Sequence, residues 1–309
     1  MKRFLQKIVE YSLYLLGVVI VIFFLIYDPY SRSSHEVNVR LASERLNAID
    51  EQKMVIIGGS GCQFGFNSQL LHDHYGLPVV NTATHACIGL QMQVNLYKSF
   101  IRPGDIVLLI PEYEQYFSSE LYNGCLDESL LRILLSNYPK GLTKLTLAQW
   151  KTTIPWIPQY ITKAMTHRPI GPLDPYSATG INEYGDVTNW EYKKAVFQEH
   201  PETSLFPIYV NMEALEFLAN FKIYCEERNA RLFLFPPTIA MSKAMPNTDF
   251  CTNLEQALID NNTPYCVSPQ RYFLPDSMFF DTYYHMVKNG AECRTNMIIH
   301  DLDSLLTQQ

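Results

Sequence analysis

The stretch Met54-Val55-Ile56-Ile57-Gly58-Gly59-Ser60-Gly61-Cys62 places a serine among glycines directly after a short apolar run. A continuous apolar run that ends in glycine is typical of a buried strand in a parallel sheet. We therefore expect a strand at residues 53–57 and a tight turn that presents the Ser60 hydroxyl. Glycines also form tight turns that carry no chemistry, so the turn alone does not establish a catalytic role.

Strand-like and helix-like segments alternate on both sides of this stretch, which predicts an α/β fold with helices on the faces of a mostly parallel sheet. The expected strands are residues 53–57, 78–81, 106–110, 231–235 and 265–267. The expected helices are residues 68–75, 89–100, 211–228 and 290–306. Prolines interrupt weakly helical stretches between residues 114 and 210, and we interpret this part as an insertion over the sheet.

The side chains that can carry chemistry follow the ends of the expected strands. In chain order they are Ser60, His85, Gly89, Glu112, Tyr113, Asp281 and His285. Loops at the carboxyl ends of parallel strands converge, so we expect these residues to lie together. A serine becomes a nucleophile when a base takes its proton and a third group orients that base, which predicts the set Ser60, His285 and Asp281. The alternative is that His285 is an ordinary surface histidine and that Asp281 is a carboxylate at a helix N-terminus, where the helix dipole favours it.

The N-terminal segment predicts a membrane anchor. Residues 11–27 carry no charge, and as a helix they extend for about 25 Å, near the minimum for a bilayer. Basic residues precede the segment, so the positive-inside rule places the N-terminus in the cytoplasm. The expected organisation is a cytoplasmic N-terminus at 1–7, a transmembrane anchor at 8–27, a linker at 28–50 and an outward-facing domain at 51–309. A cleaved signal peptide is disfavoured because residues 27–31 lack small residues at a cleavage site.

Composition excludes nucleic acid as a partner and leaves the state of the cysteines open. The chain has 24 Lys and Arg against 31 Asp and Glu, a net charge of −7, so it has no basic footprint for nucleic acid. Its seven cysteines fit either a disulfide framework or buried thiols. Their spacing does not suggest a zinc site, and we expect neither a metal nor a cofactor.

Several motifs together resemble the SGNH (GDSL-like) hydrolase superfamily. The similar stretches are Ile-Gly-Gly-Ser60, Val-Val-Asn81 with His85 and Gly89 after it, Pro-Gly-Asp105, Pro111-Glu-Tyr-Glu114, and the block from Asp281 to Arg294-Thr295. The insertion's Asn182-Glu183-Tyr184-Gly185-Asp186 is similar to the membrane-anchored branch that accompanies membrane-bound O-acyltransferases in bacterial cell-envelope clusters. The resemblance runs from about residue 50 to the C-terminus.

This resemblance implies a flavodoxin-like three-layer α/β/α fold in which Ser60 attacks an ester carbonyl, His285 is the base and Asp281 orients it. The N–H groups of Ser60 and Gly89 would hold the oxyanion. The implied function is transfer or removal of acyl groups, acetyl first, on an extracytoplasmic polysaccharide or other envelope polymer. The implied location is the bacterial cytoplasmic membrane, with the domain outside and a membrane-bound O-acyltransferase as a partner.

The sequence departs from the superfamily pattern in two places. Glu112 stands near the place of the usual asparagine, where it is either a structural carboxylate or part of the site. Three residues separate Asp281 from His285 instead of two. We therefore keep a second hypothesis, a non-catalytic assembly or binding factor with this fold, and a third, a phosphatase or metal-dependent transferase. His85 is a candidate substrate contact, and Asn182 and Glu183 lie in either a substrate-binding loop or a simple turn.

Overall fold

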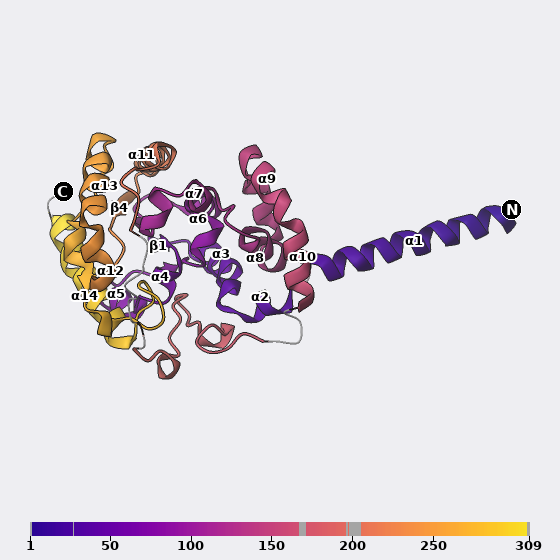
Figure 1. Ribbon diagram of the computed structural model, residues 1–309, viewed down its shortest axis with the longest axis horizontal. Helices are drawn as coiled ribbons and strands as arrows, with labels where there is room; N and C mark the ends of the chain where they lie inside the picture. Colours follow the sequence, from indigo (N-terminus) through magenta and orange to yellow (C-terminus); the bar gives the residue numbers. More distant parts are fainter. Residues whose placement is uncertain (1, 27, 167–170, 196, 198–204, 308–309) are drawn as a thin grey trace.

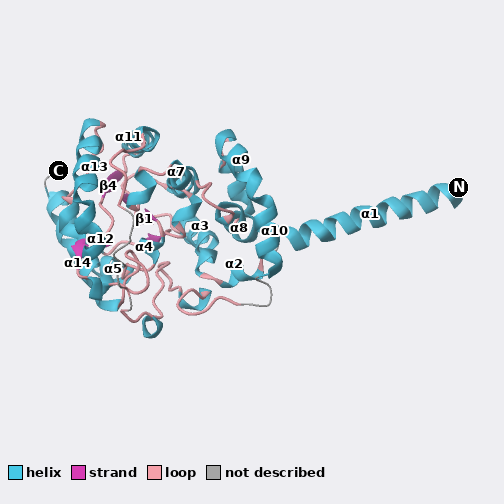
Figure 2. Cartoon of the chain, in the orientation of Figure 1, coloured by secondary structure: helices cyan, strands magenta, loops and turns pink. Residues whose placement is uncertain are grey.

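The chain forms an α/β structure with a parallel sheet, as the sequence predicts (Figures 1 and 2). The computed structural model describes residues 2–26, 28–166, 171–195, 197 and 205–307. The predicted N-terminal segment begins at Met1 and the predicted anchor ends at Tyr27, and both residues lie outside the described part, as do pieces of the insertion.

The main sheet has four parallel strands in the order β2-β1-β3-β4. They are β1 (Met54–Gly58), β2 (Val79–Asn81), β3 (Ile106–Ile110) and β4 (Arg231–Leu234). All four were predicted, and they bring the loops after β1, β2 and β3 to one edge. A second, two-stranded parallel sheet pairs β5 (Ile239–Ala240) with β6 (Phe273–Leu274), which the sequence analysis did not anticipate.

The prediction of a strand at residues 265–267 is wrong. One backbone hydrogen bond links this segment to β4, from the Cys266 N–H to the Leu234 carbonyl at 2.8 Å. Pro264 stands immediately before the segment and has no N–H to donate, which limits pairing at that end. Within the described residues, β4 is therefore the outer strand on this side.

Helices cover both faces of the sheet because its strands are apolar on both sides. Val55 and Ile57 of β1 pack on one face, in a core with α6 (Leu90–Tyr97), α11 (Met212–Glu226) and α13 (Thr248–Asp260). Met54 and Ile56 pack on the other, with α5 (Ser68–Tyr75) and α14 (Lys288–Thr307). The four predicted helices are confirmed, and the sequence analysis missed α13.

The remaining helices are short except for α1. They are α1 (Lys2–Ile26), α2 (Pro29–Ser33), α3 (Asn38–Ala48), α4 (Ser60–Gln63), α7 (Ser119–Asn123), α8 (Ser129–Asn137), α9 (Leu147–Thr153), α10 (Ile157–Thr166) and α12 (Met241–Ala244). The helix α1 projects from one end of the body (Figure 1). Within the described residues, no helix combines the length and the apolar character of a membrane span.

Residues 28–50, predicted to be a polar linker, are instead folded against the domain as α2, a 3₁₀ turn at His35–Val37, and α3. Their polar side chains are buried because they find partners: Ser31 Oγ donates to the Glu36 carboxylate at 2.6 Å. Arg132 of α8 lies 2.5 Å from the same carboxylate. The insertion likewise joins the main core through α8, whose Leu130 and Leu134 are fully buried.

A buried ion pair fixes the start of β3 beside β1. Lys53 Nζ lies 2.7 Å from Asp105 Oδ2, and both side chains are fully buried. Asp105 also accepts the backbone N–H groups of Lys53 at 3.1 Å and Arg102 at 2.8 Å. The Pro-Gly-Asp105 turn therefore sets the register of the two central strands, which positions the loops that follow them.

Candidate functional site

Ser60 is the first residue of α4 and lies directly after β1. The turn requires glycine at position 59, because a Cβ there would collide with the Glu112 carboxylate. Arg294 of α14 braces the turn, since its Nη1 donates to the Gly61 carbonyl at 2.7 Å. The Ser60 side chain is half-buried and reaches the surface of two cavities.

The structure brings His285 and Asp281 together as predicted. Nδ1 of His285 lies 2.9 Å from Asp281 Oδ1, and the imidazole stacks on Phe64 with ring centroids 4.5 Å apart. Tyr176, from the insertion, donates its hydroxyl to Asp281 Oδ2. Burial opposes ionisation of Asp281, but the hydrogen bonds from His285 and Tyr176 hold the pKa of this carboxyl below its usual value.

Ser60 and His285 line the same two cavities, each of about 320 Å³. His85 is the third residue common to both. We call the pair of cavities the serine cleft. Within the described residues there is no hydrogen bond between the Ser60 hydroxyl and His285; the hydroxyl lies 3.5 Å from Glu112 Oε1. Hydrogen bonds between a nucleophile and its base are often long before substrate binds.

Glu112 accepts the backbone N–H of Gly61 at 2.9 Å, so it fills the structural role considered for it. The same oxygen is the one nearest the Ser60 hydroxyl. Burial raises the pKa of Glu112 to about 7, while the Gly61 N–H opposes this shift. A carboxyl with this pKa is protonated in part at neutral pH and can then donate a hydrogen bond.

The first cavity, the polar cavity, extends from Ser60 towards residues that the sequence analysis did not select. Besides Ser60, His85 and His285, it is lined by Tyr30, His35, Glu36, Arg132 and Tyr176. Burial lowers the pKa of His35 to about 4, so this imidazole is neutral. Burial opposes ionisation of Glu36, but Arg132 holds the pKa of this carboxyl below its usual value. Glu36 and Arg132 form an ion pair whose charges compensate. The wall of the polar cavity therefore has no net charge and can form hydrogen bonds.

The second cavity, the apolar cavity, lies on the other side of Ser60. Besides the shared residues, its lining consists of Ala86, Cys87, Glu112, Glu114, Gln115, Leu121, Leu126, Thr282, Tyr283 and Tyr284. Leu121 and Leu126 contribute aliphatic surface to this lining, and Leu126 is 43 % exposed. Glu114 accepts hydrogen bonds from the hydroxyls of Tyr283 and Tyr284, which leaves the tyrosine rings as apolar surface.

His85 lines both cavities. Its Nδ1 accepts the backbone N–H of Cys87 at 3.2 Å, so Nε2 carries the proton of the neutral ring. Burial lowers the pKa of His85, which favours that neutral form. His85 therefore lies in the serine cleft, and its contact with substrate stays a prediction.

The structure does not support the predicted oxyanion role of Gly89. The Gly89 N–H donates to the Ala86 carbonyl at 2.9 Å and is not free for a substrate. Glycine occurs here because φ is +87° and a Cβ would meet the backbone at Gly124. Gly124 belongs to the insertion, so Gly89 serves close packing of two segments.

Tyr113 is also misplaced by the prediction. Its side chain is fully buried, with ring centroids 6.0 Å from those of both Phe206 and Phe250. Its backbone N–H is not free to donate to a substrate either, because it donates to the Tyr284 hydroxyl at 3.1 Å. Tyr113 therefore belongs to the core, whereas the neighbouring Glu112 reaches the cleft.

Asn182 and Glu183 form a structural turn and line neither cavity of the serine cleft. Asn182 Oδ1 accepts the N–H groups of Tyr184, Gly185 and Asp186 at 3.1, 3.0 and 2.9 Å. The buried Asp186 then accepts from Ser68 at the start of α5. Of the two interpretations of this loop, the simple turn is the one that the structure shows.

The described residues contain no group of three or more His, Cys, Asp or Glu side chains that could hold a metal ion. His72 and His74 are close in sequence but do not form a metal pair. His72 hydrogen-bonds to the Leu77 carbonyl, and His74 hydrogen-bonds to Asp303. All seven cysteines are free thiols. Cys87 is the one that lines the apolar cavity, and burial raises the pKa of its thiol to about 12.

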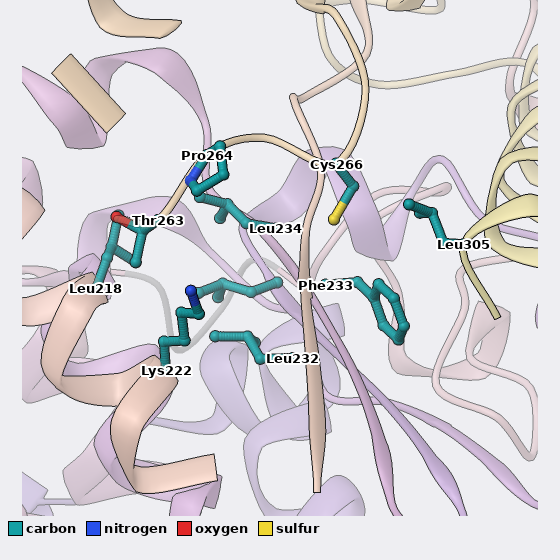
Figure 3. A pocket seen from close by; sticks show the side chains of 10 residues that line it. Leu218, Lys222, Leu232, Phe233, Leu234, Thr263, Pro264, Cys266 and Leu305 are labelled. Atoms are coloured by element: carbon teal, nitrogen blue, oxygen red, sulfur yellow. The ribbon is translucent and has the colours of Figure 1, made fainter. Parts of the chain in front are cut away.

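Another cavity, of about 200 Å³, lies along the outer strand β4 (Figure 3). Leu232, Phe233 and Leu234 form its base, between Lys222 on one side and Leu305 of α14 on the other. It occupies the place where the predicted fifth strand fails to pair. None of the predicted site residues lines it.

Tyr30, His35, Glu36, Arg132 and Tyr176 are the cleft residues that sequence reasoning missed. They come from the supposed linker and from the insertion, more than 20 residues from Ser60 in the chain. No local motif surrounds them, and only the fold brings them to the serine. Compared with models of protein families, with curated proteins and with solved structures, the chain shows no match.

Proposed function

We propose that this protein is a serine acyl-ester hydrolase or O-acyltransferase of the SGNH type. The observation that carries the proposal is the pairing of His285 with Asp281 at the rim of a cleft that Ser60 shares. The parallel strand order β2-β1-β3-β4 supports the proposed relationship, since it is the beginning of the flavodoxin-like order.

The proposed reaction begins when His285 removes the proton from the Ser60 hydroxyl. Asp281 holds Nδ1, so Nε2 is the nitrogen that accepts this proton. The serine oxygen forms a bond to the ester carbonyl carbon, and the carbonyl electrons move to oxygen. When the carbonyl re-forms, the alcohol leaves with the proton from His285, and acyl-Ser60 remains. Water or a sugar hydroxyl then attacks the acyl group in the same way and releases Ser60.

The oxyanion has two donors in this proposal. One is the Ser60 N–H, at the start of α4, where helical N–H groups have no partner within the helix. The other is Glu112 in its protonated form, whose carboxyl lies beside the serine and whose pKa is raised to about 7. The carboxylic acid would replace the side-chain donor that asparagine supplies in the superfamily, and Gly89 has no part.

The two cavities suggest where each half of an ester binds. The acyl group fits the apolar cavity beside Leu121 and Leu126, which accommodates acetyl and longer chains. The alcohol half fits the polar cavity, where Tyr30, His35 and Tyr176 can hydrogen-bond to sugar hydroxyls. A wall without net charge favours a neutral polyol over an anionic substrate.

We further propose that residues 8–27 anchor the chain in the bacterial cytoplasmic membrane, with the domain outside. Apolar side chains along α1 are exposed, among them Leu13, Leu15 and Leu16 at 63, 66 and 53 %. Exposed apolar surface of this extent indicates a partner that is not water. An anchored enzyme would lie close to envelope polysaccharide and to a membrane-bound O-acyltransferase that supplies acyl groups.

The test is hydrolysis of p-nitrophenyl acetate and of an acetylated oligosaccharide by the full-length protein. We expect Ser60→Ala to abolish both activities, and Ser304→Ala, at an exposed serine of α14, to leave them unchanged. Ester cleavage that survives in Ser60→Ala would remove the acyl-serine mechanism.

The alternative, a non-catalytic assembly or binding factor, also has an observation in its favour. The Ser60 hydroxyl is paired with Glu112 and not with His285 in the structure. If the folded protein binds acetylated oligosaccharide but cleaves no ester between pH 5 and pH 8, this second function replaces the first.

A further inference from the structure

The helices α9 and α10 expose apolar side chains at the end of the body from which α1 departs. Leu147 is 73 % exposed, Ile154 is 53 % exposed and Met165 is 65 % exposed. α1 packs against α10 and α8 at its base, and Figure 1 shows α10 beside that base with α9 farther away along the same end of the body. These three side chains, with Ile157 at the start of α10, define what we call the α9–α10 face.

The helix α9 buries two polar side chains and exposes an apolar one, beside the exposed Lys151 and Thr152. It buries Gln149 and Thr153 completely, while Leu147 points outwards. Gln149 is satisfied inside, because its Nε2 donates to the Asn123 carbonyl at 2.9 Å. Water selects helices with apolar residues inside and polar residues outside. A helix that buries its amide and exposes its leucine is suited to an apolar environment on its outer side.

The helices that carry this face contain lysines but no acidic residue, and Glu128, which precedes α8, pairs with Lys163 of α10. Residues 129–173 contain no Asp or Glu, although the chain as a whole has a net charge of −7. Lys140, Lys144 and Lys151 are exposed within this stretch, and within the described residues none of them has an ion-pair partner. Lysines beside exposed apolar residues are the signature of a helix that lies in a membrane interface.

We propose that the α9–α10 face lies on the bilayer, with its apolar side chains in the headgroup region and its lysines on anionic lipid headgroups. The proposal rests on the proposed membrane location of α1 and is independent of Ser60 chemistry. Two contacts, α1 and the α9–α10 face, would fix the orientation of the domain. α8 carries Arg132 of the polar cavity and contacts both α1 and α10, so the serine cleft would have a fixed direction relative to the membrane.

The test is photocrosslinking of the full-length chain in lipid nanodiscs of phosphatidylcholine with phosphatidylglycerol. Benzoylphenylalanine replaces Leu147 or Met165 in the test variants, and Ile259, an exposed residue of α13, in the control. A fourth variant at Leu16 reports separately on the anchor. All four positions are exposed, so each substitution leaves the core intact.

We expect lipid adducts by mass spectrometry at Leu147 and Met165 and none at Ile259. The variant Lys144→Glu/Lys151→Glu should lower the adduct yield at Leu147 about fivefold or more in the anionic bilayer and leave it unchanged in pure phosphatidylcholine. Absence of lipid adducts at both test positions, or adducts to a protein there, overturns the proposal whatever Leu16 shows. If Lys144→Glu/Lys151→Glu leaves the adduct yield at Leu147 unchanged in the anionic bilayer, the proposed role of anionic lipid is overturned.

Discussion

Asp281 Oδ1 lies 2.9 Å from Nδ1 of His285, although three residues separate the two in the chain instead of the two that are usual in SGNH proteins. The extra residue is accommodated because the loop turns at Thr282, whose hydroxyl accepts the N–H of His285 at 3.0 Å. The carboxylate therefore reaches the imidazole despite the altered spacing. This pair also gains a third member from the insertion, the hydroxyl of Tyr176.

Asp281→Asn should lower kcat for ester hydrolysis by about 10³-fold to 10⁴-fold, because the amide no longer favours the tautomer in which Nε2 accepts the serine proton. Steady-state kinetics with p-nitrophenyl acetate measures the loss. Asp303→Asn is the matched control, since Asp303 also pairs with a histidine, His74 at 3.0 Å, but on the exposed side of α14. Equal kinetics for Asp281→Asn and the wild type would show that Asp281 does not orient the base.

Glu112→Gln should flatten the pH profile. In the wild type, kcat/KM should fall as pH rises through about 7, because ionisation of Glu112 removes a donor and places a negative charge beside the oxyanion. Glutamine keeps an acceptor for the Gly61 N–H and offers an amide N–H at every pH. We therefore expect higher activity than the wild type at pH 8. A variant that keeps the same falling limb would assign that limb to another group.

Tyr176→Phe should lower kcat about tenfold, the worth of one hydrogen bond to a charged group. It should also raise the pKa of Asp281, because the tyrosine hydroxyl stabilises the carboxylate. Carbon NMR titration of the labelled carboxyl measures that pKa directly. Tyr192→Phe, at an exposed tyrosine of the same insertion, should change neither quantity. An unchanged Asp281 titration in Tyr176→Phe would contradict the hydrogen bond.

Leu126→Trp should alter the preference for acyl chain length by filling part of the apolar cavity. We expect kcat/KM for an octanoyl ester to fall about tenfold while that for an acetyl ester stays within about twofold, since only the longer chain buries methylenes there. Ile259→Trp, on α13, is the control for an added indole. A loss that is equal for both esters would place the acyl group elsewhere.

Lys53→Met should destabilise the domain by about 3–5 kcal/mol, because it leaves the buried Asp105 carboxylate without its counterion. Urea unfolding followed by tryptophan fluorescence measures the change. Adding Asp105→Leu should recover part of this stability by removing the uncompensated charge. If the single variant is as stable as the wild type, the pair does not hold β3 to β1.

The sequence predicted the sheet, and the proximity of Asp281 to His285, because both have local signals. An apolar run that ends in glycine marked β1, and a continuous apolar run after the Pro-Gly-Asp105 turn marked β3. The known geometry of parallel sheets then predicted that Ser60, His85, Glu112 and His285 lie at one edge. Gly89 was misassigned because its oxyanion role rested on the resemblance alone, and sequence does not show which N–H groups are free. Tyr113 was misassigned because neighbouring residues after a strand point in different directions.

The polar wall of the cleft was beyond sequence reasoning for a physical reason. His35 and Glu36 lie in a stretch with many polar residues, which is also the composition of a solvated linker. They are buried only because Arg132, almost a hundred residues later, compensates the charge of Glu36. Long-range compensation of this kind leaves no periodic pattern in either segment.

The most direct test of the central claim, that His285 activates Ser60, is labelling with a fluorophosphonate followed by peptide mass spectrometry. We predict a phosphonyl adduct on the Ser60 hydroxyl in the wild type, and its near-complete loss in His285→Ala with the fold intact by circular dichroism. A wild type that stays unlabelled, or a His285→Ala variant that reacts at the wild-type rate, would contradict the account.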